Sequence, residues 1–447
     1  MKTWYKLFIS FSLLLLLLCL SFGVIAAVSF FKDLYFPNMM SFEQARPFHV
    51  SAALFWILTA ATGLIMYYKQ ELFGDAPMYH KLSPFYIGTW VFAVAAILLS
   101  YCFQQFGGRE YWEFPPVWNL LLLVAWVYLL ISFFGTLFRS GKEKPVYVWM
   151  WGTGLLFFLF TFTEQNLWHI AWFRESFLKE MTIQWKSNGS MVGAWNQMVY
   201  GLGLFLMVKI SGDKEIARSK KAYFSYFLGL TNLIFNWGHH IYNIPTAGWV
   251  RGVSYTISMT EWVLVISIIQ GFKSKLTEQR KFKHLLSYRL LIASEFWVFM
   301  NLLLALLMSV PAINRYTHGT HVTVAHAMGT TIGINTMILL ASITFLFEAD
   351  KEKKPAYRRN FAIGFWITQI SLFAFWVFLI AAGLIKGMKM TASPSAPFTE
   401  LMQNVYPVLK LFMYSGFVLF AGMSVLVIQL LSKAAGQLST TDDSATN

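Results

Sequence analysis

The sequence predicts an all-α membrane protein with about twelve transmembrane helices. Hydrophobic residues make up 57% of the 447 positions and charged residues only 13%, a balance that a water-exposed surface does not tolerate. Apolar stretches of about 20 residues, the length that crosses the hydrocarbon core, recur along the whole chain. The aromatic share of 18% suits both membrane-interface belts and the walls of large flat cofactors.

The apolar stretches define about twelve expected spans. They lie at residues 7–29, 47–68, 85–106, 116–138, 146–164, 189–210, 222–243, 250–272, 288–310, 323–348, 361–385 and 404–432. Since the first stretch lacks a small-residue cleavage site, it predicts a retained helix and not a signal peptide. No linker or repeat interrupts the chain, so we expect one membrane domain over residues 1–438 and a polar tail over residues 439–447.

The positive charge is distributed unevenly. Lys and Arg gather in the connections after the even-numbered spans, at residues 139–144, 214–221, 273–283 and 351–359. The positive-inside rule therefore predicts that these loops and both termini are cytoplasmic. The net charge of +14 then matches anionic lipid headgroups of the bilayer and does not indicate a nucleic-acid partner.

Histidines supply the candidate chemistry. Both cysteines, Cys19 and Cys102, lie outside any Cys-x-x-Cys or Cys-x-x-Cys-His pattern, which excludes a disulfide framework, structural zinc and covalently attached haem. Four of the nine histidines lie within or at the edge of spans: His49, His239, His240 and His326. Because ionisable groups are costly in lipid and usually face a bundle interior, this distribution predicts a cofactor site shared by several helices.

The segment from Tyr316 to Gly333 is the most informative stretch. Its residues His326 and Met328 point about 200° apart on an α-helix, so that one helix could ligate two cofactors side by side. A second interpretation stays open, in which His326 hydrogen-bonds a neighbouring helix and Met328 fills space against lipid. The histidines elsewhere in the chain are needed to choose between these two interpretations.

The adjacent pair His239 and His240 favours metal binding. Side chains one position apart diverge by about 100°, and long imidazoles can still converge on one metal ion between them. In the next span, Glu261 is a carboxylate in mid-helix, which predicts functional chemistry from its cost in the membrane.

These residues resemble a known family. Arg46-Pro47-Phe48-His49, Gly238-His239-His240, Glu261 and the run from Thr317-His318-Gly319-Thr320 to Ala325-His326 are similar, in order and spacing, to the large subunit of bacterial nitric oxide reductase. That large subunit represents a branch of the haem-copper oxidase superfamily, so the resemblance implies a haem-copper-oxidase-like bundle of twelve helices in the bacterial inner membrane. The resemblance extends over nearly the whole chain.

The resemblance implies two haem b groups and a non-haem iron. It implies His326 as the proximal ligand of the high-spin haem, His49 as a ligand of the low-spin haem, and His239 and His240 as iron ligands. It also implies that Glu261 lies near the iron. A further set of residues would lie near haem propionates or a calcium site: Arg46, Glu110, Glu113 and His318.

Four positions depart from the family pattern. Asn188 stands at the place of a third iron-binding histidine, and Val192 and Asn196 stand where the family has glutamates, so one helical stripe has lost its ligands and carboxylates. An amide oxygen is a weaker iron ligand than imidazole, and valine cannot relay a proton. Met328 replaces the second axial histidine of the low-spin haem; it either ligates that haem, raising its potential, or leaves it without this ligand.

The resemblance implies a respiratory, denitrification-type enzyme that joins two molecules of nitric oxide to nitrous oxide and water, with electrons from a cytochrome c subunit or another donor. One alternative is a nitric oxide dismutase forming dinitrogen and oxygen, which needs no net protons or electrons and would tolerate the changed stripe. A terminal oxygen reductase, with copper in place of the non-haem iron, is less favoured, because no tyrosine precedes His239 and Val192 stands four residues after Asn188. A non-catalytic haem sensor and a solute transporter complete the alternatives.

Overall fold

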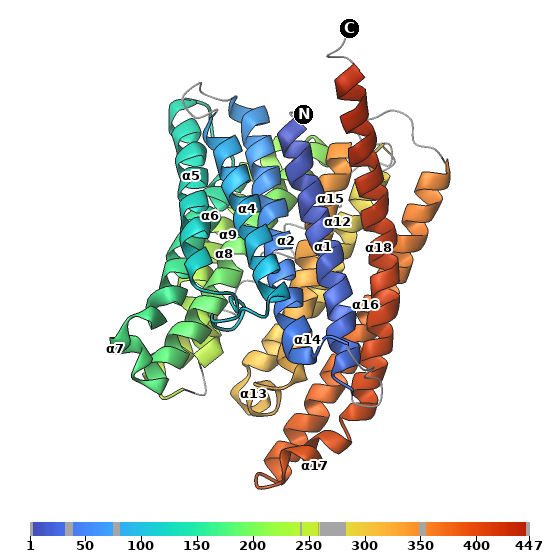
Figure 1. Cartoon of the computed structure of the whole chain (residues 1–447). Coiled ribbons are helices and arrows are strands. Elements are labelled where there is room, and N and C mark those ends of the chain that lie inside the picture. The colour runs from blue at the N-terminus through green and yellow to red at the C-terminus, as the bar shows by residue number, and fades with distance from the viewer. Residues whose placement is uncertain are drawn as a thin grey trace. The chain divides into compact units, whose positions relative to one another are not determined.

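The computed structural model describes residues 3–31, 39–74, 81–241, 244–257, 259, 283–347 and 355–443. Within these ranges the secondary structure is helical, apart from one isolated bridge between Arg109 and Trp112. The prediction of an all-α membrane protein is confirmed, and Figure 1 shows that long helices make up most of the chain.

The long helices are named here with their bounds. They are α1 (Thr3–Ser29), α2 (Phe42–Phe73), α4 (Leu82–Cys102), α5 (Val117–Arg139), α6 (Val146–Gln165), α8 (Phe177–Ser211), α9 (Lys220–Phe235), α12 (Leu285–Ser309), α15 (Met337–Phe347), α16 (Pro355–Ala392) and α18 (Tyr406–Asp443). The short ones are η2 (Asn166–His169), α7 (Ala171–Arg174), η3 (Lys214–Ala217), η4 (Asn236–Ile241), α13 (Pro311–Thr317), α14 (His321–Met328), η5 (Gly329–Thr336) and α17 (Phe398–Gln403).

Ten helices in the described part are long and apolar enough to cross a membrane, and α14, η5 and α15 form one of them, His321–Phe347. The expected span at 222–243 corresponds to α9 and η4, of which α9 has only 16 residues. Most of the expected span at 250–272 lies outside the described residues, which are helical at 248–257. The prediction of about twelve spans is therefore consistent with the structure.

Contacts between Cα atoms divide the chain into two units. Unit 1 comprises Met1–Phe22, Glu43–Thr277 and Gln437–Asn447, and unit 2 comprises Gly23–Phe42 and Glu278–Gly436. The single domain over 1–438 stays a prediction. At the C-terminus, α18 continues to Asp443, into the residues expected to form a polar tail.

The core of unit 1 is built from tryptophans that also make polar contacts. Trp90 and Trp126 are almost fully buried, 1% and 2% exposed. The Trp126 indole Nε1 donates to the Leu155 carbonyl at 2.9 Å, and the Trp90 indole donates to Thr59 Oγ1 at 2.8 Å. Each bond joins two different helices, so these side chains both fill space and fix the angle between helices.

Lys69, near the end of α2, is only 1% exposed. Its ammonium group donates to the Ser132 carbonyl, Ser132 Oγ and Thr136 Oγ1 of α5 at 3.2 to 3.3 Å. A buried cation is tolerated only when its donors are satisfied, and hydroxyls one turn apart on α5 provide that here.

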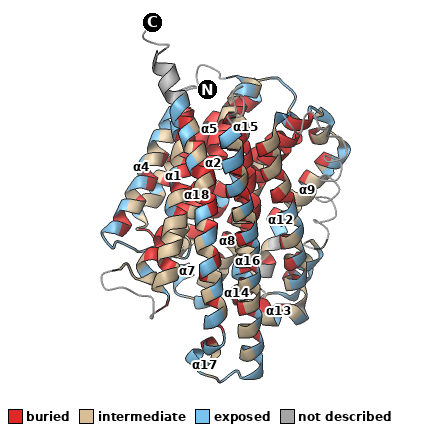
Figure 2. Ribbon diagram, turned by 90° about the vertical axis from the view of Figure 1, so that its right-hand side faces the viewer, coloured by how far each residue is buried: buried red, intermediate tan, exposed pale blue. Residues whose placement is uncertain are grey.

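On α16 and α18, buried and exposed residues alternate along the helix (Figure 2). One face of each helix packs against the protein, and the other face is free for lipid.

In unit 2 the helix that begins at His321 changes geometry in its middle. Residues Gly329–Thr336 form a π-helix between α14 and α15. Thr336 Oγ1 donates to the Thr331 carbonyl five residues earlier at 2.8 Å, a bond that fits the wider π spacing. Because π segments are uncommon and often mark functional positions, this irregularity next to His326 and Met328 is informative.

The buried indole of Trp126 yields a stability prediction. Replacing Trp126 with Phe removes the bond to Leu155 and leaves a void, which should destabilise the folded protein by about 2–3 kcal/mol. Thermal unfolding in detergent measures this. Trp366→Phe is the matched control, because Trp366 is 59% exposed and its replacement should change stability by less than about 0.5 kcal/mol; equal losses for both variants would contradict the assignment.

Candidate functional site

His49 lies early in α2 and is oriented by α1. Its Nδ1 is 2.8 Å from the Cys19 carbonyl oxygen, and the Cys19 thiol sulfur is 3.6 Å from the same nitrogen. A carbonyl only accepts hydrogen bonds, so Nδ1 carries the proton and Nε2 keeps its lone pair. A neutral imidazole held in this tautomer by a backbone carbonyl is the form in which histidine ligates a metal.

The histidine pair does not lie on an α-helix. Asn236–Ile241 is the 3-10 helix η4, so neighbouring side chains diverge by about 120° instead of the expected 100°. The Trp237 indole donates at 2.6 Å to the Ile234 carbonyl, the group that a continuing α-helix would bond to the Gly238 amide. Competition for that carbonyl is the physical reason for the tighter turn. The side chain of His239 lies outside the described part of the structure.

His240 packs directly on α8. A Cβ at Gly189 would lie 2.3 Å from the His240 ring, so only glycine allows this approach. The preceding residue, Asn188, is 7% exposed, and its amide Oδ1 is buried without a hydrogen-bond partner. Leaving such an oxygen unpaired costs about 1–3 kcal/mol, which a metal ion or bound ligand would relieve. We call the Asn188 oxygen and the His240 imidazole the donor pair: each is a group that can bind a metal, and the contact at Gly189 brings their two elements together.

The α8 stripe carries no acidic group after Asn188. Val192 and Asn196 are half-buried one and two turns after Asn188. Glu180, the one carboxylate of α8, lies two turns before Asn188 and pairs at 2.6 Å with Arg109. Among the described residues there is no group of three His, Cys, Asp or Glu side chains that could hold a metal; a site here would need the His239 side chain or Glu261, neither of which the structure describes.

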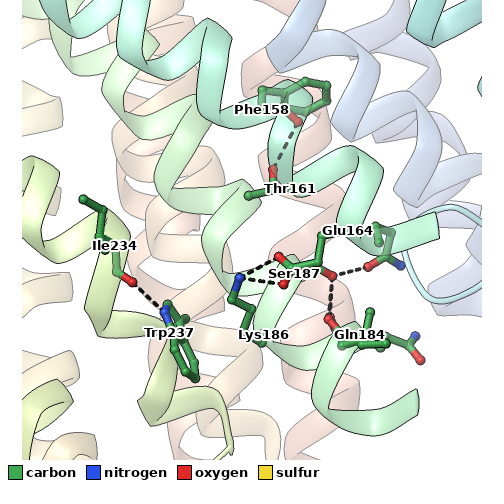
Figure 3. Close-up of polar contacts among 10 residues, drawn as sticks. Phe158, Thr161, Glu164, Gln184, Lys186, Ser187, Ile234 and Trp237 are labelled. Atoms are coloured by element: carbon green, nitrogen blue, oxygen red, sulfur yellow. Dashed lines mark hydrogen bonds and ion pairs between the residues drawn. The ribbon is translucent and has the colours of Figure 1, made fainter. Parts of the chain in front are cut away.

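A polar clasp holds α8 against α6 just before Asn188. Both carboxylate oxygens of Glu164 lie 2.6 Å from the Lys186 ammonium, and Ser187 Oγ donates to Gln165 Oε1 at 2.6 Å (Figure 3). The Lys186 Nζ is also 5.6 Å from the centre of the Trp237 ring. Sequence reasoning missed this clasp, because its charges stand at the borders of two spans and nothing in the pattern pairs them.

Arg46, Glu110 and Glu113 form a second polar cluster in unit 1. Arg46 Nη1 bonds Glu113 Oε1, and Arg46 Nη2 is 3.7 Å from Glu110 Oε1. Burial raises the pKa of Glu113 above its usual value, and the Arg46 guanidinium opposes that rise. The guanidinium thus gives both glutamates a cationic partner. Calcium at Glu110 and Glu113 stays a prediction, as does the propionate role of Arg46 and His318; His318 caps the end of α13 in unit 2.

Unit 2 contributes His326 and Met328 on α14, both half-buried. The His326 Nδ1 is buried, and no hydrogen bond of normal geometry reaches it within the described structure. Asn301 Nδ2 donates to Thr330 Oγ1 at 2.7 Å, and Thr330 Oγ1 donates to the His326 carbonyl at 3.2 Å. This chain of two bonds anchors the backbone of His326 to α12, immediately before the π-helix begins.

The described residues fit the implied cofactors in their chemistry. His49 offers a free Nε2, His326 has a buried orphan nitrogen, and Asn188 has a buried orphan oxygen. Leaving such groups unpaired in a membrane protein is costly, and a bound cofactor, metal or ligand would remove that cost. Glu261, the expected acidic residue, lies outside the described residues.

Comparison with known proteins defines the class. Residues 3–419 match the family model described as Cytochrome C and Quinol oxidase polypeptide I. The chain therefore belongs to this family, the haem-copper oxidase superfamily of membrane oxidoreductases that bind haems and a metal at a binuclear centre.

Particular relatives divide between two activities. The chain is 25% identical to a nitric oxide reductase subunit of Stutzerimonas stutzeri, over 85% of this chain and 83% of that protein. It is 24% identical to the Cbb3-type cytochrome c oxidase subunit CcoN1 of the same organism, over 86% and 84% of the two chains. In fold it is similar to a solved haem-copper terminal oxidase dimer, with a TM-score of 0.74 at 12% identity, covering 97% of this chain and 84% of that one.

The Arg46 cluster yields a pH prediction. Arg46→Gln removes the cation that opposes the effect of burial, so the pKa of Glu113 should rise further. Infrared titration of the purified protein should then show a protonated carboxyl band that persists to higher pH and is absent in Glu113→Gln. Arg109→Gln, which unpairs Glu180 instead, is the control; if the band does not move with Arg46→Gln, Arg46 does not set the ionisation of Glu113.

Proposed function

We propose that this chain is the catalytic subunit of a nitric oxide reductase. It would join two molecules of nitric oxide to nitrous oxide and water, with two electrons and two protons supplied for each turnover. A high-spin haem and a non-haem iron, when bound, supply the redox chemistry that brings the two nitrogen atoms together. The electrons would come from a cytochrome c subunit or another external donor.

The observation that carries the proposal is the donor pair of His240 and Asn188. The Gly189 contact holds the His240 ring against α8, and the buried, unpaired Asn188 oxygen lies next to that glycine. An imidazole and a neutral oxygen suit iron and copper alike, and the similarity to a nitric oxide reductase subunit favours iron. His239 would complete this set, and His49, His326 and Met328 would hold the two haem b groups.

The chain's own residues limit how protons reach the site. Val192 cannot carry a proton and Asn196 is neutral, so the stripe of α8 that follows Asn188 offers no acid. Proton delivery would fall to Glu261 or to the outer-loop glutamates Glu110 and Glu113. The closed pairing of Arg46 with Glu113 leaves Glu261 as the favoured acidic group.

Oxygen reduction is the second candidate function, and the oxidase relatives favour it. Against it, no tyrosine stands just before His239 or at Val192 to supply an electron and a proton to bound oxygen. A nitric oxide dismutase would also tolerate the loss of acids on α8, because it consumes no net protons.

One experiment separates the three activities. The purified protein is given isotope-labelled nitric oxide with and without reductant, and the gases are identified by mass spectrometry. We expect labelled nitrous oxide only with reductant. Labelled oxygen and dinitrogen without reductant would establish the dismutase, and consumption of oxygen with no product from nitric oxide would establish the oxidase.

Asn188 allows a direct test of the metal site. Asn188→His replaces an amide oxygen with a stronger imidazole ligand and should tighten metal retention about 10- to 100-fold. Metal content per haem after dialysis against chelator, together with the electron paramagnetic resonance signal of the nitric oxide adduct, measures this. Asn196→His, two turns further along α8, should change neither; equal effects from both variants would remove Asn188 from the site.

A further inference from the structure

The end of the α16–α18 hairpin in unit 2 carries positive charge with little negative charge to balance it. The connection from Lys386 to Lys410 contains Lys386, Lys389 and Lys410, and Glu400 is its single carboxylate. None of the ion pairs between described residues involves Arg315, Lys386 or Lys389. These three cations are therefore available to an external anionic group.

Close packing brings Arg315 of α13 to the same place. A Cβ at Gly387 would lie 1.9 Å from the Tyr316 carbonyl oxygen, so the backbone of α16 rests directly on α13. The Arg315 guanidinium lies 4.6 Å over the ring of Tyr316. Lys386, the neighbour of Gly387, is close enough to His321 to interact with it electrostatically. The charges thus lie beside the start of α14, the helix that carries His326.

Large apolar side chains are exposed among these charges. Met388, Met390 and Phe398 are 55%, 44% and 63% exposed. Lys386 Nζ lies 5.7 Å from the centre of the Phe398 ring, and Met390 follows Lys386 by one helical turn. We call these five residues, Arg315, Lys386, Lys389, Met390 and Phe398, the hairpin-end surface.

The hairpin end has a core of its own, so this surface is preformed. Met402, Val405 and Leu409 are buried to 2%, 0% and 4% exposure and pack with Phe31 and Ala382. Figure 1 shows α16 and α18 running together past α13 and ending at α17. The hairpin end therefore has a packed interior of its own, and Met388, Met390 and Phe398 remain exposed outside it.

The hairpin end lies outside the hydrocarbon. The 38 residues of α16 extend about 57 Å at 1.5 Å per residue, against about 30 Å for the hydrocarbon core. Its apolar run ends at Ile385, and that of α18 begins at Leu411. The other end of α16 follows the strongly basic connection at 351–359, which is expected to be cytoplasmic. The hairpin end is thus on the outer side, where Lys and Arg are ordinarily fewer and their retention needs a reason.

We propose that the hairpin-end surface is the docking site for a water-soluble electron-donor domain with an acidic face. The inference rests on the proposed function only in that the chain takes electrons from an external donor. Acidic groups on the donor would meet Arg315, Lys386 and Lys389 and accelerate association. Met390 and Phe398 supply the apolar centre that such interfaces bury inside a charged rim.

The test uses two soluble haem proteins of opposite charge. The full-length protein in nanodiscs of neutral phosphatidylcholine is mixed, without nitric oxide or oxygen, with a reduced acidic bacterial cytochrome c or with basic mitochondrial cytochrome c. Stopped-flow spectroscopy follows reduction of the nanodisc-bound haem. We expect the acidic cytochrome to react faster, with a rate that falls about tenfold or more as salt rises and screens the charges.

Charge reversal locates the surface. The double variant Lys386→Glu, Lys389→Glu should slow reduction by the acidic cytochrome about tenfold or more and weaken its salt dependence. The matched control, Arg359→Glu with Lys433→Glu at the opposite end of α16 and α18, should leave both unchanged. If the reversed variant does not fold, Lys386→Gln with Lys389→Gln tests the same charges. Equal rates for variant and control, or a preference for the basic cytochrome, would overturn the proposal.

Anionic lipid is the alternative occupant of the hairpin-end surface. The same variants distinguish lipid from an electron-donor domain. Phosphatidylglycerol retained through purification is measured by mass spectrometry. If charge reversal releases this lipid and leaves cytochrome reduction unchanged, the surface binds lipid and the proposal is wrong. These measurements do not use nitric oxide. A failure of the docking proposal can therefore be distinguished from a failure of the proposed catalytic activity.

Discussion

The high cost of an unsatisfied polar group in hydrocarbon governs the structure. In the core of unit 1 the cost is met internally: the buried Lys69 donates to two hydroxyls and a carbonyl, and the indoles of Trp90 and Trp126 each find an acceptor on another helix. The Asn188 oxygen and the His326 Nδ1 are among the buried side-chain atoms for which the described structure shows no hydrogen bond of normal geometry. Both belong to residues that we propose to hold a metal or a haem.

The contact between η4 and α8 shows how a site is assembled from residues that are individually ordinary. Trp237 takes a carbonyl from the helix and tightens the backbone into a 3-10 turn. Gly189 gives the His240 ring room to lie on α8. The Lys186–Glu164 and Ser187–Gln165 pairs then hold α8 against α6 at the turn before Asn188. A 3-10 turn, close packing and a partly buried ion pair thus meet where His240 contacts α8.

Unit 2 relies on a different device. The backbone of His326 is tied to α12 through Thr330 and Asn301, and the helix widens into a π segment directly afterwards. His326 and Met328 both lie in the α-helical part, α14, so their side chains point to opposite sides of the helix. The π segment then leads into α15.

The sequence by itself determined the membrane class, most of the spans and the family. Hydrophobic length is a local property, and a helix in lipid satisfies its own backbone, so His49 and His326 could be placed on their helices from pattern alone. The changed stripe at Asn188, Val192 and Asn196 was also predictable, because residues four apart share a helical face. Family membership followed from the same histidines in their order along the chain.

Only the tertiary structure decided which groups meet. The bond from His49 to the Cys19 carbonyl, the pairing of Arg46 with Glu110 and Glu113, and the contact of His240 with Gly189 all join residues on separate elements. The η4 geometry was mispredicted because a tryptophan side chain displaced a backbone hydrogen bond, which no helical periodicity reveals. The physical reason is general: apolar length is read along one helix, whereas a partner for a polar atom is chosen by the packing of several.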